Sequence, residues 1–155
     1  MCYCIFRLFF QTISAFLATL GFGIIFNIKG KKLFFASLGG AIGWFFYSLP
    51  LEFNFSELAS LFISAIFFSS YCEIFARILK TPVTTLVICA LIPLVPGGGM
   101  YYTMLEAVNG NVSKSLDLGL NTLASAGTLA LGIIFVSTIT KLITTHNTNK
   151  KKEMI

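Results

Sequence analysis

The chain has 155 residues, of which 56% are hydrophobic and only 11% are charged, and its mean hydropathy is +0.87. This composition excludes a soluble globular domain, a disordered tail and a coiled coil. The net charge of +5 does not indicate a nucleic-acid-binding protein, because the charges gather in short clusters between long uncharged stretches.

Five uncharged, apolar runs follow one another along the chain, at 8–28, 33–51, 58–72, 81–105 and 118–140. An α-helix needs about 20 residues, at 1.5 Å each, to cross the hydrocarbon core of a bilayer. The third run reaches this length if Glu57 and Glu73 lie at its two ends. Barrel strands alternate polar and apolar residues, whereas these runs are apolar on all sides. We therefore expect an all-α integral membrane protein with about five transmembrane helices.

The charges between the runs are divided unequally between the two sides of the membrane. With five spans, the side that holds Arg7 has two basic and four acidic residues. The other side has nine basic residues against Glu73 and Glu153: Lys29, Lys31, Lys32, Arg77, Lys80, Lys141, Lys150, Lys151 and Lys152. Cytoplasmic loops of membrane proteins carry an excess of Lys and Arg. We therefore expect the N-terminus outside and the C-terminus in the cytoplasm.

These patterns predict one transmembrane domain, residues 1–145, and a basic cytoplasmic tail, residues 146–155. The lysines of the tail suit the anionic headgroups of the lipid bilayer, and no nucleic-acid partner is expected. The first run is longer than the apolar core of a secretory signal, so we expect it to be retained as a helix.

The sequence contains no motif of catalysis or metal binding. Cys2, Cys4, Cys72 and Cys89 lack the spacing of a zinc site, and His146 stands alone in the polar tail. The apolar runs hold no paired carboxylates, and no hydrolase or phosphate-loop motif is present. We therefore expect no enzyme activity, no catalytic residue, no metal and no cofactor.

Small residues at helical spacing predict close helix contacts in three of the runs. Gly39 and Gly43 form a GxxxG pair in the second run. Ladders of small residues four apart occur in the first and fifth runs: Ala15, Thr19 and Gly23, and Ala124, Thr128 and Gly132. Residues of this size let two helix backbones approach each other. These contacts can lie within this chain or with a partner subunit, and the sequence leaves both open.

The fourth run differs from the others because prolines and glycines lie at its centre. Pro93 and Pro96 each lack a backbone N–H and disfavour helical geometry at the preceding residue, while Gly97, Gly98 and Gly99 add backbone freedom. We expect the helix to be interrupted at Pro93–Gly99, in the middle of the membrane. Broken helices at this depth are typical of transport sites, because their freed backbone groups need a polar cavity or protein partners.

A half-helix that restarts at these glycines presents free amides and the positive end of its dipole to the break. A carboxylate can approach such amides closely, because glycine has no side chain. Tyr101 and Tyr102 add hydroxyl groups and aromatic surface on the next turn. The pattern predicts a site for an anionic group of a small substrate. A simple proline kink that serves helix packing is the alternative.

The segment PLVPGGGMYYTM, at 93–104, resembles the signature of the threonine/serine exporter family. The resemblance continues through GFGIIFN at 21–27, GGAIGW at 39–44 and the stretch 121–126, so it spans nearly the whole chain. It is closest to the small (YjjB-type) subunit of the split, two-component form.

This resemblance implies a secondary transporter of the bacterial cytoplasmic (inner) membrane. It implies export of threonine and serine, as in the fused members, or of a dicarboxylate such as succinate, as in a split form. It also implies a larger membrane subunit of the same family as the partner, because this chain matches only the shorter part of the fused proteins.

Three further polar positions have open interpretations. Asn27 and Asn121 lie in the matched stretches and either line a pathway or make hydrogen bonds at the interface or between helices. Glu106, at the edge of its run, either couples proton movement to export or lies solvated at the membrane rim. Asn54 and Glu57 have the spacing of a helix capping box.

Two functions remain from the sequence. In the first, the chain is a transport subunit that binds substrate at the broken span, and the candidate residues are Pro93, Pro96, Gly97, Gly98, Gly99, Tyr101, Tyr102 and Asn121. In the second, it is a non-transporting scaffold or assembly subunit that packs against a larger membrane protein.

Overall fold

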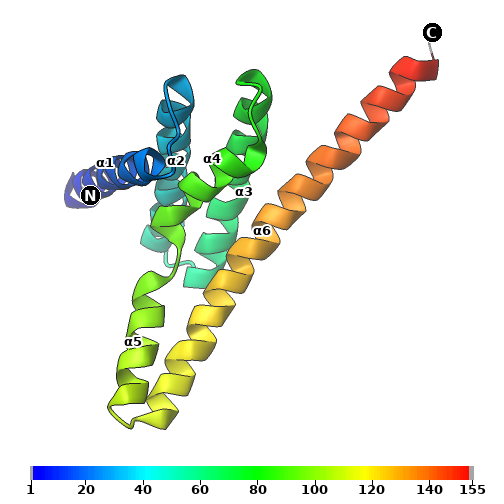
Figure 1. The fold of residues 1–155 in the computed structure, drawn as a ribbon. Coiled ribbons are helices and arrows are strands. Elements are labelled where there is room, and N and C mark those ends of the chain that lie inside the picture. The colour runs from blue at the N-terminus through cyan, green and yellow to red at the C-terminus, as the bar shows by residue number, and fades with distance from the viewer. Residues whose placement is uncertain (1, 154–155) are drawn as a thin grey trace.

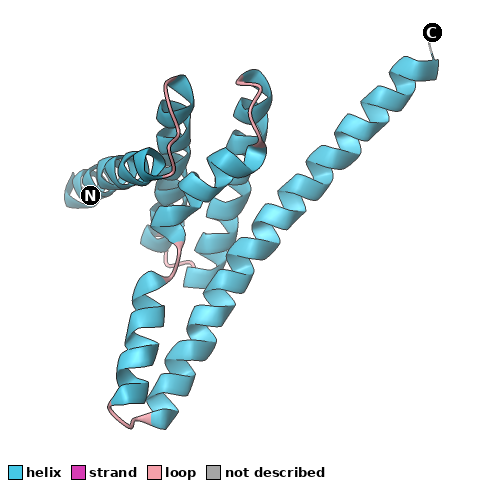
Figure 2. Cartoon of the chain, in the orientation of Figure 1, coloured by secondary structure: helices cyan, strands magenta, loops and turns pink. Residues whose placement is uncertain are grey.

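The computed structural model describes the backbone of residues 2–153 and the side chains of residues 6–144. These residues form helices joined by short loops, and no strand occurs among them (Figures 1 and 2). The elements in chain order are α1 (Cys2–Ile25), α2 (Lys31–Glu52), α3 (Glu57–Ile78), α4 (Val83–Leu91), the 3₁₀ turn η1 (Ile92–Leu94), α5 (Gly97–Val108) and α6 (Val112–Glu153).

Four helices, α1, α2, α3 and α6, are each long and apolar enough to cross a bilayer. The segments Val83–Leu94 and Gly97–Val108 pass the same test as one span that is bent by 55°. The expectation of about five transmembrane helices with an interrupted fourth is therefore confirmed. α6 continues to Glu153, so no helix end marks the expected boundary between residues 145 and 146. The side chains of the expected tail, Lys150 among them, lie outside those that the structure describes.

The third span, α3, extends beyond its uncharged run and includes the carboxylate of Glu73. We expected Glu73 to end this span, but α3 continues to Ile78. Arg77, one turn further, lies 3.8 Å from the Glu73 carboxylate and donates a hydrogen bond of 2.8 Å to the Thr144 hydroxyl of α6. Only 12% of the Glu73 side chain is exposed. The nearby positive charge reduces the cost of placing a carboxylate there, which lets the helix continue.

α1 and α2 form an antiparallel pair that is closest where their residues are small. A side chain at Gly40 would collide with Thr19, and one at Gly23 would collide with Leu33. Thr19 is fully buried, and its hydroxyl donates to the carbonyl oxygen of Ala15 in its own helix at 2.8 Å. The hydroxyl is thus satisfied inside a tight helix contact.

The core of the molecule lies between α2, α3 and α4, where Ala36, Ala65, Phe68, Leu86 and Ala90 are fully buried.

The GxxxG pair of α2 faces this core. A Cβ atom at Gly39 would lie 3.2 Å from that of Ala90, and one at Gly43 would lie 3.1 Å from the Leu94 side chain. Ser64 of α3 donates a hydrogen bond of 2.6 Å to the carbonyl oxygen of Gly43. The structure therefore places these two glycines against helices of the same chain.

α6 packs against α5 with its first part and against α3 with its later part (Figure 1). Gly132 is buried at the contact with α3, where an added Cβ atom would lie 2.5 Å from that of Ala65. Leu129 and Val136 are buried on the same face. Thr128 is half-buried and donates its hydroxyl to the carbonyl oxygen of Ala124 at 2.8 Å. Small and apolar residues thus join α6 to the core.

The start of α3 differs from the capping box that its sequence suggests. Ser56 is the N-cap, and its hydroxyl accepts a hydrogen bond of 3.3 Å from the N–H of Ala59. Asn54 has a φ of 60° and belongs to the preceding turn. The expected pairing of Asn54 with Glu57 is therefore wrong, because asparagine readily adopts the left-handed conformation that this turn requires.

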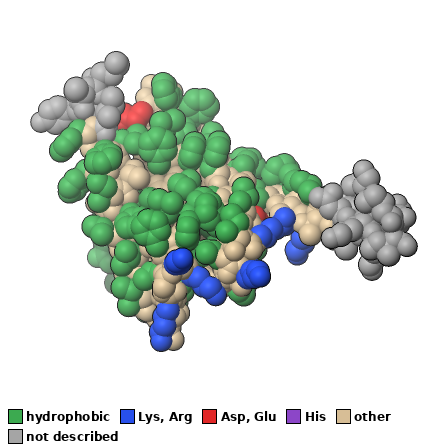
Figure 3. Space-filling view, turned by 90° about the horizontal axis from the view of Figure 1, so that it is seen from above, with side chains coloured by type: hydrophobic (Ala, Val, Ile, Leu, Met, Phe, Trp, Pro, Cys, Tyr) green, Lys and Arg blue, Asp and Glu red, His purple; other side chains and the backbone are tan. Residues whose placement is uncertain are grey.

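Basic residues gather at one end of the helices. The α1–α2 and α3–α4 loops both lie at the top of Figure 1, and they contain or adjoin Lys29, Lys31, Lys32, Arg77 and Lys80. Figure 3, seen from that end, shows the Lys and Arg side chains along one edge of the face, with hydrophobic atoms over the rest of it.

Candidate functional site

The fourth span contains a true break in its helical backbone. α4 ends at Leu91, η1 follows, and Val95 is extended, with φ −60° and ψ 128°. α5 then begins at Gly97 and continues to Val108. The break is narrower than we expected, because Gly97–Gly99 already form the first turn of α5. First-turn residues need no helical acceptor for their amides, so these glycines can begin the helix directly after Pro96.

Two backbone amides at this break have no hydrogen-bond acceptor. The N–H of Val95 reaches the carbonyl oxygen of Leu91 at 3.2 Å, and that of Gly97 reaches the carbonyl oxygen of Val95 at 2.7 Å. Among the described residues, none accepts from the N–H groups of Gly98 or Gly99. These groups form the positive end of the α5 dipole. The break therefore offers two donors to an anionic group.

The three glycines have different surroundings. Gly97 and Gly98 are exposed, and a Cβ atom at either would meet no other atom within 4 Å. A side chain at Gly99, in contrast, would collide with the hydroxyl of Thr122 on α6. Thr103 donates a hydrogen bond of 2.7 Å to the carbonyl oxygen of Gly99. Gly99 thus allows α5 to pack closely against α6, while Gly97 and Gly98 leave open space at the break.

Tyr101, Tyr102 and Asn121 line none of the hollows found among the described residues. The two tyrosines are 63% and 56% exposed, and their rings contact each other edge to face at 5.4 Å between centroids. Asn121 is exposed on α6, next to Thr122. Thr122 is therefore the residue of α6 that touches the glycine turn. No pattern in the sequence favours Thr122 over its neighbour Asn121, because the rotation of α6 against α5 decides which residue faces the contact.

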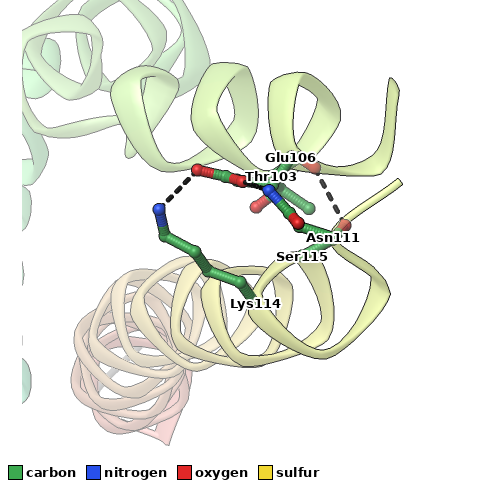
Figure 4. A network of polar contacts seen from close by, with 5 residues as sticks. All are labelled: Thr103, Glu106, Asn111, Lys114 and Ser115. Carbon is green, nitrogen blue, oxygen red and sulfur yellow. Dashed lines mark hydrogen bonds and ion pairs between the residues drawn. The ribbon is translucent and has the colours of Figure 1, made fainter. Parts of the chain in front are cut away.

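A network of polar contacts links α5 to the start of α6 (Figure 4). The Glu106 carboxylate accepts hydrogen bonds from Lys114 and from the side-chain amide of Asn111, the latter at 2.7 Å. Ser115 donates to the carbonyl oxygen of Thr103 at 2.9 Å. Only 13% of the Glu106 side chain is exposed. Glu106 is therefore an ion-paired group that holds the hairpin rather than a carboxylate in free solution.

A hollow of about 400 Å³ adjoins Pro93 on the side of the break that faces α1. Gln11 and Ser14 of α1 and Trp44 of α2 contribute to its lining. No sequence pattern predicts that these residues lie together, since they come from segments that only the fold brings into contact. The one available signal was Gln11, an amide inside an apolar run.

Metal-binding groups do not assemble in the described part of the chain. No set of three or more His, Cys, Asp or Glu residues lies close enough there to hold an ion. Cys72 and Cys89 are buried in the core as free thiols, whereas the side chains of Cys2, Cys4 and His146 lie outside the described ones.

Comparison with protein families gives one decisive match. The family model described as Threonine/Serine exporter, ThrE, matches residues 11–139, which include the break, the glycine turn and Asn121. The chain belongs to the threonine/serine exporter family. No curated protein and no solved structure matches it. Membership of the exporter family, together with the apolar helices, indicates a component of a multi-pass membrane transporter.

Proposed function

We propose that this chain is the small membrane subunit of a two-component secondary transporter that exports small carboxylates or amino acids, such as threonine, serine or succinate. One observation carries the proposal: at a break in a membrane-spanning helix, none of the described residues accepts a hydrogen bond from the amides of Gly98 and Gly99. An unsatisfied backbone group in hydrocarbon costs several kcal/mol. A polar ligand or water in a transport pathway removes that cost.

The site binds the carboxylate of the substrate at the start of α5. The two amides donate hydrogen bonds to it, and the helix dipole adds about 0.3 to 2 kcal/mol. The open space at Gly97 and Gly98 admits the ligand without displacing any side chain of this chain. Tyr101 and Tyr102 remain candidates for contacts with substrate at the subunit interface, because both side chains are exposed within the span.

A larger membrane subunit of the same family is the proposed partner. α5 has no buried residue and makes its main contacts with α6. Its other faces present Met100, Met104 and Val108, which are 58%, 71% and 85% exposed. Lipid can cover these side chains, but it cannot satisfy the amides of the glycine turn. A second subunit over α5 encloses the break and completes a polar pathway.

The proposed location is the bacterial inner membrane, with the basic end in the cytoplasm and the N-terminus outside. The clustering of Lys29, Lys31, Lys32, Arg77 and Lys80 at one end supports this orientation, because such clusters are retained on the cytoplasmic side.

Reconstitution tests the two-component proposal. Vesicles that contain this chain and its larger subunit should show saturable export of radiolabelled L-threonine, L-serine or succinate, and vesicles that contain this chain alone should show none. Full transport by the chain alone would contradict the need for a partner. A stable complex that transports none of the three would instead favour the scaffold function.

A further inference from the structure

A hollow of about 340 Å³ lies in the seam between α3 and α6, along the part of α3 that leads to the α3–α4 loop. Four of its lining residues belong to α3 and one belongs to α6: Ser70, Glu73, Ile74, Arg77 and Thr140. Arg77 lies in the last turn of α3. The hollow therefore begins near the end of the bundle where the basic loops lie, at the top of Figure 1, and extends into the span.

Three basic residues meet at this end of the seam. Arg77 donates a hydrogen bond of 2.8 Å to Thr144, so it lies against the turn of α6 that also carries Lys141. The backbone N–H of Lys80 donates to the carbonyl oxygen of Arg77 at 3.3 Å, which keeps the loop residue close. Against these three positive charges the hollow contains the carboxylate of Glu73. The end of the seam is therefore positively charged.

Arg77 can bind an anion without giving up the contacts that it has. Its contacts with Glu73 and Thr144 both use the Nη2 atom. A guanidinium group has five N–H donors, and its planar fork pairs with phosphate through two parallel hydrogen bonds. The Arg77 side chain is 53% exposed, and Lys141 is exposed as well. Both side chains are thus accessible to a ligand beside the seam.

Exposed apolar side chains flank the charged end of the seam on both helices. They are Ile74 and Ile78 of α3 and Leu142 and Ile143 of α6, with exposed fractions of 58%, 65%, 66% and 57%. A soluble anion would leave these side chains uncovered. A phospholipid pairs its phosphate with the basic groups and covers the apolar side chains with its acyl chains. The arrangement of charge beside apolar surface therefore fits a lipid.

We propose that an anionic phospholipid binds in the seam between α3 and α6. Its phosphate pairs with Arg77 and Lys141, and its acyl chains lie over Ile74 and Ile78. The positive charge of the seam favours a lipid with a net negative charge, because the cation of a zwitterionic lipid neutralises its own phosphate. This goes beyond a general attraction of basic residues to the membrane surface, because it assigns one site that links two helices.

Native mass spectrometry of the purified full-length chain in detergent tests the preference for an anionic lipid. Phosphatidylglycerol should bind saturably, and at least about fivefold more tightly than phosphatidylcholine or phosphatidylethanolamine. Inorganic phosphate should not displace it, since phosphate lacks acyl chains. Equal binding of phosphatidylethanolamine would mean that Glu73 pairs with its ammonium group, and displacement by phosphate would mean that the site takes a soluble anion. Either result would overturn the proposal.

Substitution of single basic residues tests the position of the site. Arg77→Gln and Lys141→Gln should each weaken phosphatidylglycerol binding about fivefold, the effect of one basic residue at a membrane surface. Lys29→Gln removes the same charge at the same end of the bundle, in the α1–α2 loop, and should leave binding unchanged. An equal loss in all three variants, or no loss in Lys141→Gln, would contradict a site in this seam.

Circular dichroism of each variant checks that the helices are retained. Arg77→Gln also removes the contacts with Glu73 and Thr144, so the fold of this variant is the one at risk. Lys141→Gln breaks no ion pair found among the described residues, so it keeps the test decisive if Arg77→Gln fails to fold.

Co-purification with the larger subunit separates a lipid from a protein as the occupant of the seam. Lys141→Gln should keep its partner while it loses the lipid. If this variant loses the partner and still binds phosphatidylglycerol as the wild type does, the seam binds an acidic segment of the partner and the lipid proposal is wrong. Lipid binding is measured without substrate, so its result does not depend on the transport function proposed above.

Discussion

The Thr19 side chain of α1 occupies the space that a Cβ atom at Gly40 of α2 would need. Both residues are buried, and the Thr19 hydroxyl is satisfied by the carbonyl oxygen of Ala15. This contact holds the two helices together near their connecting loop. The hollow that Gln11, Trp44 and Pro93 line is found further along the same seam, so the position of α1, and with it the position of Gln11, depends on this contact.

Gly40→Val is therefore expected to destabilise the fold. The new side chain collides with the Thr19 side chain, its hydroxyl first, and overpacking of this kind costs about 1 to 3 kcal/mol. A thermal unfolding experiment on the protein in detergent should show a lower Tm. Gly21→Val is the matched control, because a Cβ atom at Gly21 on α1 meets no atom within 4 Å. Equal Tm values for the two variants would contradict the described contact.

Gly43→Leu should act on the fold of this chain as well. Gly43 lies between Leu94 and Phe68, and its carbonyl oxygen accepts the hydroxyl of Ser64. A leucine there should lower the Tm of the isolated chain and displace the break next to Leu94. If the isolated chain is unaffected and only its co-purification with a larger subunit is lost, Gly43 lies on a partner surface instead.

The spans and the break could be predicted because their causes are local in sequence. Long apolar runs determine which segments cross the membrane, and Pro93 and Pro96 interrupt the helix through their own missing N–H groups. The side on which Gly43 packs could not be predicted. A GxxxG pair identifies a close contact without identifying the neighbour, and here the neighbours come from α3 and η1.

The ion pair between Glu106 and Lys114 gives a third prediction. Glu106→Gln removes the charge while keeping the shape, and it should weaken the α5–α6 hairpin, because the carboxylate pairs with Lys114. Hydrogen exchange at Asn109–Val112, measured by mass spectrometry, should become faster. Asp117→Asn is the control, since Asp117 takes no part in the network that Figure 4 shows. If hydrogen exchange becomes faster to the same extent in both variants, the net charge of the hairpin stabilises it and the pair of Glu106 with Lys114 does not.

The orientation of the helices gives a fourth prediction. In a variant without native cysteines, a cysteine at Glu57 should react with a membrane-impermeant reagent from outside, and one at Lys31 from the cytoplasm. Lys31 begins α2 and Glu57 begins α3, so the helix α2 separates the two positions. Labelling of both from the same side would contradict five spans.

The hollow beside Pro93 could not be predicted because no motif joins its residues. Gln11 and Ser14 belong to one helix and Trp44 to the next, and the register of α1 against α2 brings them together. Asn121 shows the same limit at the break. The sequence pointed to a polar residue of the last span, but the rotation of α6 places Thr122 against Gly99.

The central claim is that substrate binds at the amides of the broken fourth span, and Gly98→Val tests it most directly. The wild-type geometry leaves space for a side chain at Gly98, so the variant should fold and bind its partner normally. The valine occupies the place of the substrate carboxylate and blocks the amide of the glycine turn.

The measurement is export of radiolabelled L-threonine, L-serine and succinate from vesicles that contain the two-subunit complex, with Gly127→Val as control because Gly127 is equally open. The account predicts at least about a tenfold loss of export for Gly98→Val, at unchanged Tm and partner binding, and no loss for Gly127→Val. Normal export by Gly98→Val would contradict a substrate site at this break.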